Sequence, residues 1–164
     1  MAKHAVVRTD NLTGTDVRSQ LISIRYMGAD GNTATEIDNG NVVKVGALEE
    51  GQREVHVGTD VAADTDLTDV VLIASVETMY DEHKKNLDEF VNEAGTICRG
   101  YYLNGHGDTF AVTAEALTGT PTVGAKVTLA AGTKMEVGGS GTAVGTIIAE
   151  EIAGRYTYFV IKID

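Results

Sequence analysis

The sequence is short of several residue types, and each shortage narrows what the chain can be. Among its 164 residues there is one cysteine, Cys98, which excludes an internal disulfide and a cysteine-rich zinc site. We interpret Cys98 as a small, half-buried apolar residue. Aromatic residues make up 5% of the chain, tryptophan is absent, and Pro121 is the only proline. Together with 19 glycines, this composition predicts a turn-rich β protein with a core of Val, Ile and Leu.

Basic residues are also scarce. The chain has 13 Lys and Arg against 24 Asp and Glu, a formal net charge of −11. This balance argues against nucleic acid as a partner, because phosphate binding requires basic side chains gathered on one face. It equally disfavours an anionic membrane surface. The charge is uneven: residues 60–93 hold ten acids and two bases, whereas the remainder holds fourteen acids and eleven bases.

Long apolar runs are missing as well. No stretch approaches the roughly 20 apolar residues that span a bilayer. The first ten residues lack the apolar segment of a secretory signal, so we expect a soluble protein made inside the cell. The length suits a single domain over residues 1–164. Residues 1–12 are short and polar around Val6 and Val7, and they are interpreted as an edge strand or an extended N-terminal arm.

The stretch from Pro121 to Asp164 has the clearest β pattern. Short apolar runs at Val127–Ala130, Val144–Ala149 and Tyr156–Ile163 are separated by clusters of glycine. Runs rich in β-branched and aromatic residues between such clusters are typical of strands. This stretch is therefore expected to form half of a compact β body.

The first half of the chain follows the same rhythm. Val17–Met27 alternates, and its better core face holds Ile22, Ile24 and Tyr26. Val70–Val76 is the most apolar run and predicts a strand buried on both faces. Asp30 with Gly31, and Asn39 with Gly40, are turn signals. Further strands are expected over Thr33–Ile37, Asn41–Val45, Gln52–Val57, Thr96–Leu103 and Thr109–Leu117.

One segment has helical spacing. Thr78 can cap a helix whose apolar or large residues recur every three or four positions, and Gly95 would end it. The stripe comprises Val76, Tyr80, His83, Leu87, Phe90 and Ala94. The fold expected is mainly β, a small β-sandwich or barrel-like body with one α-helix near residues 79–94, and α+β is the alternative. Residues 59–95 are interpreted as an acidic loop plus helix inserted between the two β halves.

The chemistry-bearing residues form no convincing constellation. His106 and Asp108 lie in a Gly-rich turn, where two metal ligands could be presented together. One imidazole and one carboxylate are too few for a closed site, and turn formation explains the same residues. Asp60, Asp64 and Asp66, with Asp69, resemble a weak cation loop but lack the EF-hand pattern, so we interpret them as a solvated loop.

Three further motifs have plainer interpretations. Gly138–Thr142 lacks the lysine that ends a phosphate-binding loop and is interpreted as a flexible hairpin tip. His83 is expected to be a core or interface histidine. Asn11–Thr13 matches a glycosylation acceptor, which means little without a secretion signal. No catalytic residue, cofactor-binding residue, cofactor or metal ligand is therefore assigned from the sequence.

Several segments carry a family resemblance. Val123–Leu129, Val144–Glu150 and Tyr158–Asp164 resemble the β-rich core of phage capsid cement, or head-decoration, proteins, in which a Gly-initiated strand, a Gly-rich turn and two more strands succeed one another. Asn39–Gly46 is similar to an earlier strand of these proteins. The expected helical segment departs from the small cement proteins and is interpreted as an insertion that extends a contact surface.

This resemblance implies a non-enzymatic protein that stabilises a phage capsid. Such a protein is made in the host cytoplasm, binds the major capsid protein on the outside of the virion, and is often a trimer. An extended arm would suit strand addition to a neighbour. Two alternatives stay open: another virion component, such as a head-fibre, tail or minor coat protein, and a small metal-dependent hydrolase that uses His106, Asp108 and another carboxylate.

Overall fold

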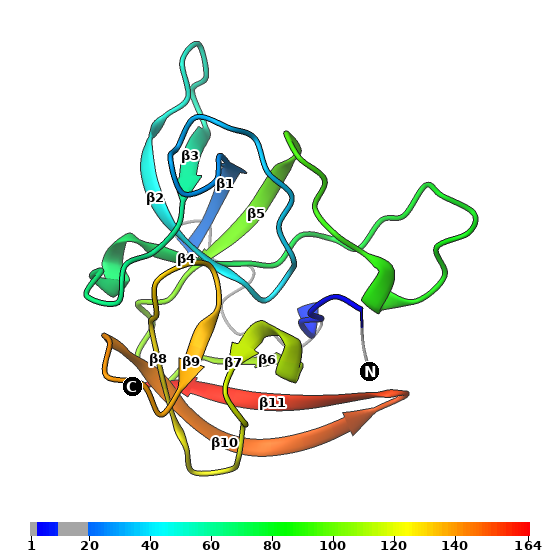
Figure 1. Ribbon diagram of the computed structural model, residues 1–164, viewed down its shortest axis with the longest axis vertical. Helices are drawn as coiled ribbons and strands as arrows, with labels where there is room; N and C mark the ends of the chain where they lie inside the picture. Colours follow the sequence, from blue (N-terminus) through cyan, green and yellow to red (C-terminus); the bar gives the residue numbers. More distant parts are fainter. Residues whose placement is uncertain (1–2, 10–19) are drawn as a thin grey trace.

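Two β-sheets packed against each other make up the structure (Figure 1). It is a computed structural model, and it describes residues 3–9 and 20–164. The expectation of a mainly β fold is confirmed. Among the described residues, no helix is long and apolar enough to cross a membrane.

The first sheet is a closed five-stranded barrel. Its strands are β1 (Leu21–Tyr26), β2 (Val42–Leu48), β3 (Val55–Thr59), β4 (Val70–Ile73) and β5 (Ile97–Tyr102), in the order β1-β3-β2-β4-β5. Strand directions cannot alternate all the way around a ring with an odd number of strands, so one neighbouring pair must be parallel. That pair is β1 and β3, with Ser23 opposite Val55, and the other four pairs are antiparallel.

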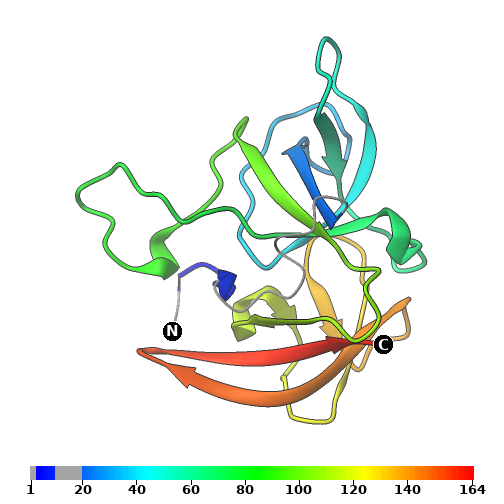
Figure 2. The same cartoon turned by 180° about the vertical axis from the view of Figure 1, so that it is seen from behind.

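The second sheet has six strands in the order β6-β11-β10-β8-β9-β7. They are β6 (Thr109–Val112), β7 (Leu117–Thr118), β8 (Lys126–Thr128), β9 (Met135–Val137), β10 (Ala143–Ala153) and β11 (Tyr156–Ile163). The bounds of β11 are those of the predicted run, and β10 runs four residues past the predicted Ala149. The long β10–β11 hairpin extends beyond the other strands in both views (Figures 1 and 2).

Strand β4 links the two cores, because both of its faces are buried. The buried strand predicted over Val70–Val76 is confirmed as far as Ile73, whereas Val76 is exposed. Val71 and Ile73 pack inside the barrel with Ile24, Tyr26 and Cys98. Val70 and Leu72 face the other way and share a core with the six-stranded sheet. The members of this shared core from that sheet include Phe110, Val112, Leu129, Ile147 and Ile161. Burial of apolar surface between the sheets therefore holds them together.

Residues 3–9 run along the open side of β6. Val7 forms a bridge with Val112, and the amide of Arg8 donates to the carbonyl of Ala111. Val6 and Val7 are fully buried. The expected N-terminal arm thus covers an edge strand of its own chain over these residues, which protects a sheet edge from other strands. The remainder of residues 1–12 lies outside the described residues.

Two predicted elements are wrong, and the strand predicted over Thr109–Leu117 is correct only as far as Val112, because a 3₁₀ turn follows at Ala114–Ala116. Thr33–Ile37 is not a strand: Ile37 forms only an isolated bridge, with Asn92. The helix over residues 79–94 is absent too, since that region contains a single 3₁₀ turn, η4 (Leu87–Glu89). Two other short 3₁₀ turns, η3 (Leu67–Asp69) and η5 (Ala114–Ala116), lie elsewhere in the described chain.

The missing helix has a physical explanation. Most helical stability in proteins comes from packing an apolar face. Of the predicted stripe only Phe90 is buried, whereas Val76, Tyr80 and Leu87 are exposed, so most of the stripe has no core to pack on. Local side chains also capture backbone N–H groups that a helix would use. Asp81 accepts from the amide of His83, and Glu89 accepts from the amides of Lys85 and Asn86.

Candidate binding surface on the excursion between β4 and β5

Residues 74–96 leave the barrel after β4 and return to it at β5. This excursion projects to one side of the molecule in both views (Figures 1 and 2). It includes most of the acidic residues of the segment 60–93. Hydrogen bonds to distant parts of the chain fix it at several points. A projecting segment that is fixed in place can present side chains to a partner with little loss of conformational entropy on binding.

Asn39, in the connection between β1 and β2, holds the outgoing limb. Its side-chain nitrogen donates to the carbonyl of Ser75 over 2.9 Å, and its side-chain oxygen accepts from the amide of Ser75 over 3.0 Å. The side chain of Asn39 thus pairs with the backbone of Ser75 as a strand neighbour would. Asn39 is buried, so these bonds are shielded from water.

Asn92 holds the returning limb at the same place. Its side-chain nitrogen donates to the carbonyl of Ile37 and to the side-chain oxygen of Asn39, each over 3.0 Å. The backbone groups of Ile37 and Asn92 exchange two more hydrogen bonds of 3.0 Å. Both limbs are therefore tied to residues 37–39, which closes the excursion at its base.

The middle of the excursion is tied to the second sheet. The hydroxyl of Tyr156 donates to a carboxylate oxygen of Asp88 over 2.8 Å, and this bond holds the pKa of Asp88 below its usual value. The amide of His4 donates to the carbonyl of Asp88. Glu89 accepts the amides of Asn86 and Lys85, which likewise lowers its pKa. Turn η4 is thus fixed against the β10–β11 hairpin and the N-terminal segment.

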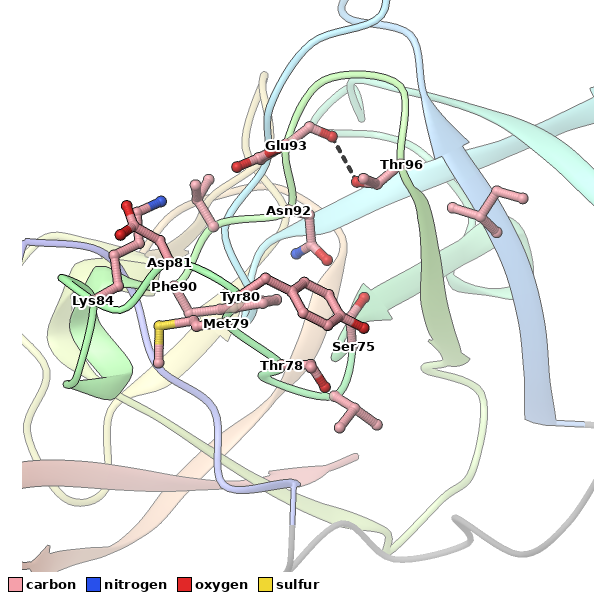
Figure 3. A pocket seen from close by; sticks show the side chains of 13 residues that line it. Ser75, Thr78, Met79, Tyr80, Asp81, Lys84, Phe90, Asn92, Glu93 and Thr96 are labelled. Carbon is pink, nitrogen blue, oxygen red and sulfur yellow. Dashed lines mark hydrogen bonds between the residues drawn. The ribbon is translucent and has the colours of Figure 1, made fainter.

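A depression of about 350 Å³ opens on the excursion, and Figure 3 shows the side chains around it. Its apolar rim is unusually exposed: Tyr80 is 94% accessible, Val76 63% and Ile97 51%. Ser75, Val76 and Ile97 also line a more open depression that continues onto β1. We call Val76, Tyr80 and Ile97 the apolar rim. Aromatic and aliphatic side chains on the edge of a hollow are typical anchors of a protein interface.

His106 and Asp108 do not form a metal site among the residues described. They lie in the turn between β5 and β6, with His106 exposed. The backbone of Asp108 closes the turn, as its amide donates to the carbonyl of Gly105 and its carbonyl accepts from Ile163. Across residues 3–9 and 20–164, no three His, Cys, Asp or Glu side chains are grouped so that they could hold a metal ion.

The aspartates of the acidic loop from Asp60 to Asp69 have separate structural roles. Asp60 accepts a short hydrogen bond from the hydroxyl of Tyr26, and burial with this neighbour raises the pKa of the tyrosine. Asp66 caps η3 by accepting from the amide and hydroxyl of Thr68. Asp64 and Asp69 are exposed, and these carboxylates are not grouped into a metal site among the described residues.

Gly138–Thr142 connects β9 to β10, and it is not an open tip at Gly141. A Cβ there would lie 2.0 Å from the carbonyl oxygen of Leu129 and 2.7 Å from that of Ala63. The amide of Thr142 donates to the carbonyl of Ala63 over 2.7 Å. The glycine-rich segment therefore joins the second sheet to the acidic loop of the barrel.

The remaining candidates are quickly placed. Cys98 is buried inside the barrel, where desolvation raises its pKa to about 11. A thiol in that state is a poor nucleophile. His83 lies on the exposed part of the excursion and not in the core. Asn11–Thr13 lies outside the described residues.

Sequence reasoning missed the two asparagines that close the excursion. Local pattern marks Asn39 only as a turn residue and places Asn92 within the predicted helix, although both are buried. Their types carry a signal, because an asparagine side chain carries both a donor and an acceptor and can imitate a peptide group. The partner residues are 36 to 55 positions away, a separation that no local pattern reveals.

Comparison of the chain with protein-family models, with curated proteins and with solved structures finds no match.

Proposed function

We propose that this protein is a structural virion protein that binds the outside of a phage capsid and stabilises the shell. The apolar rim of the excursion is the observation that carries the proposal. It supplies three exposed apolar side chains around a hollow on a body whose net charge is −11. The resemblance of the strand segments to head-decoration proteins indicates the same role.

The partner we propose is the major capsid protein, which contacts the apolar rim with an apolar surface bordered by basic residues. Desolvation of Tyr80 and Val76 would supply affinity, and the acidic surroundings would favour a basic border. Copies would be present on the capsid exterior in large number, as homo-oligomers, and the resemblance to head-decoration proteins implies a trimer. No specific observation favours the head-fibre, tail, minor coat or hydrolase alternatives over this role.

Sedimentation with purified capsids of the parent phage tests the proposal, using shells taken before and after expansion. The wild-type protein is expected to bind to saturation and to raise the unfolding temperature of expanded shells. Tyr80→Asp and Val76→Asp should each weaken binding at least about tenfold, because interface anchors dominate affinity.

Leu48→Asp is the matched control. Leu48 is an exposed apolar residue of β2 that lines neither depression at the apolar rim, so this variant should bind like the wild type. Light scattering would give the number of copies in the free protein. Absence of binding to both kinds of shell would refute the proposed function.

A further inference from the structure

Half of strand β10 has a strand partner on one side only. Strand β11 pairs with β10 from Gly145 to Ala153, whereas β8 pairs with it only from Ala143 to Thr146. Backbone bonds from residues 124–125 cover Ile147. Among the described residues, no backbone group bonds to the outer side of residues 148–153. We call residues 148–153 the free edge of β10.

The free edge belongs to the part of the hairpin that extends beyond the other strands (Figures 1 and 2). It exposes two large apolar side chains, Ile152 at 79% and Ile148 at 47%. An exposed row of backbone donors and acceptors with apolar side chains is a template for an added strand. The opposite edge region of the sheet, at β6, is already covered by residues 3–9.

The charges on the free edge determine which kind of strand can pair with it. Glu151 forms an ion pair with Arg8, whose guanidinium lies 3.2 Å from its carboxylate, but the side chain of Glu151 stays 44% exposed and keeps part of its repulsion toward another carboxylate. Glu150 is exposed and forms no ion pair with any described residue. One carboxylate thus remains without a counter-charge in the middle of the edge, two positions from Ile152.

These charges disfavour a second copy of the chain. Two copies of the free edge could pair as antiparallel strands with five or six residues of one copy opposite residues 148–153 of the other. Each such register places a glutamate opposite a glutamate, either Glu150 opposite Glu151, Glu150 opposite itself, or Glu151 opposite itself. Like charges directly opposite each other destabilise a strand pair. The net charge of −11 on each copy adds long-range repulsion.

We propose that the free edge of β10 binds an extended segment of a partner protein by strand addition, and that this segment carries a Lys or Arg opposite Glu150. Glu150 lies opposite Phe159 and Ile152 opposite Thr157 in the β10–β11 ladder, so Glu150 and Ile152 share one face. The added segment therefore places its basic residue two positions from an apolar residue that packs on Ile152. Backbone hydrogen bonds supply affinity, and these two positions supply selectivity.

This site is separate from the apolar rim, and it does not depend on the proposed function. Its test needs only the full-length protein and a synthetic peptide. The probe is a capped peptide with lysine and valine alternating on one face and threonine on the other. Its partner probe has glutamate in place of each lysine, and a third probe replaces the central threonine by proline to block the backbone pairing.

Binding is measured by calorimetry and located by amide hydrogen exchange. The lysine peptide is expected to bind and to slow the exchange of amides in residues 148–153, while the proline peptide should not bind. Glu150→Lys should weaken the lysine peptide by roughly two- to fivefold and strengthen the glutamate peptide by a similar factor. Glu54→Lys, an exposed change in the β2–β3 connection, should leave both affinities unchanged.

Three results would overturn the inference. The lysine peptide does not bind, or it binds but protects amides away from β10. The Glu150→Lys change leaves the affinities of both charged peptides as they are in the wild type. Light scattering shows that the free protein is a dimer with the amides of residues 148–153 already protected, which would make a second copy the occupant.

Discussion

The side-chain oxygen of Asn39 accepts a 3.0 Å hydrogen bond from the side-chain nitrogen of Asn92, 53 positions away in the sequence. Both side chains are buried; that of Asn39 also bonds the backbone of Ser75 in the outgoing limb, and that of Asn92 bonds the backbone of Ile37 between β1 and β2. This pair turns a stretch of irregular chain into a closed excursion with a fixed base. The position of the apolar rim therefore depends on two amide groups that do not themselves reach the surface.

Replacement of Asn39 by alanine is expected to destabilise the protein by about 2 kcal/mol, because the backbone groups of Ser75 lose their partner in a buried place. Urea unfolding measures this loss. Trypsin should also cleave after Lys84 and Lys85 faster, since the excursion loses its tie. The exposed Asn104 provides the control, and equal behaviour of Asn39→Ala and Asn104→Ala would show that the pair has no structural role.

The buried thiol of Cys98 makes stability fall at alkaline pH. Its pKa is about 11 in the folded protein against an ordinary value of 9.0, so the unfolded chain loses the proton first. The contribution of Cys98 is complete below the unfolded pKa and is lost as the pH rises toward the folded one. At about pH 10 the loss is on the order of 1 kcal/mol.

Urea midpoints measured from neutral pH to about pH 10 test this expectation. Cys98→Ala should show a smaller alkaline loss than the wild type, because Tyr26 and the other groups are the same in both. A thiol reagent should react with the native protein only as it unfolds. Rapid reaction of the folded protein would contradict the burial of this side chain.

The bond between Tyr156 and Asp88 gives the protein a dependence on acid pH. The pKa of Asp88 is lowered in the folded protein, so its contribution is present above the ordinary value of 3.8 and is lost as the pH falls through the folded pKa. Tyr156→Phe should cost about 1 kcal/mol near neutral pH and should flatten the loss in acid. Tyr80→Phe, with an exposed hydroxyl, is the control. Parallel pH profiles for all three proteins would contradict this assignment.

Gly141 is expected to tolerate no side chain. A Cβ would meet backbone carbonyl oxygens of Leu129 and Ala63, which cannot move without shifting both sheets. Gly141→Ala should therefore lower the free energy of unfolding by roughly 1–3 kcal/mol. Ser140→Ala, one position away and exposed, should cost little. Thermal unfolding of the two variants decides the matter, and equal melting temperatures would show that the connection is loose.

The strands of this protein follow from local pattern. The alternation in β1 and the continuous apolar run of β4 predict which side chains are buried, since side chains on a strand point alternately to opposite faces. The run from Tyr156 to Ile163 predicts β11 with its bounds. The proposed role as a capsid decoration protein stays a prediction, and so do the partner and the oligomeric state.

The failed helix shows where local pattern ends. The spacing of Val76, Tyr80 and Leu87 is helical, but spacing stabilises a helix only where a core receives the apolar face. Here Asn39 and Asn92 fix the two limbs, and two side chains of the predicted buried stripe, Val76 and Tyr80, belong instead to the exposed apolar rim. Asn39 lies 36 positions before Ser75, so the local sequence of the excursion does not reveal this contact.

By itself, the amino-acid sequence determined that this chain builds a mainly β structure with little aromatic core, one unpaired thiol and an acidic middle. Composition and period-two alternation are local properties, and they favour strands whichever strands become neighbours in the sheet. The tertiary structure decided the closed barrel, the sharing of β4 between two cores, the clamp on the excursion and the free edge of β10. Each of these depends on which distant segments meet, because burial and hydrogen bonding reward a contact only once both partners are in place.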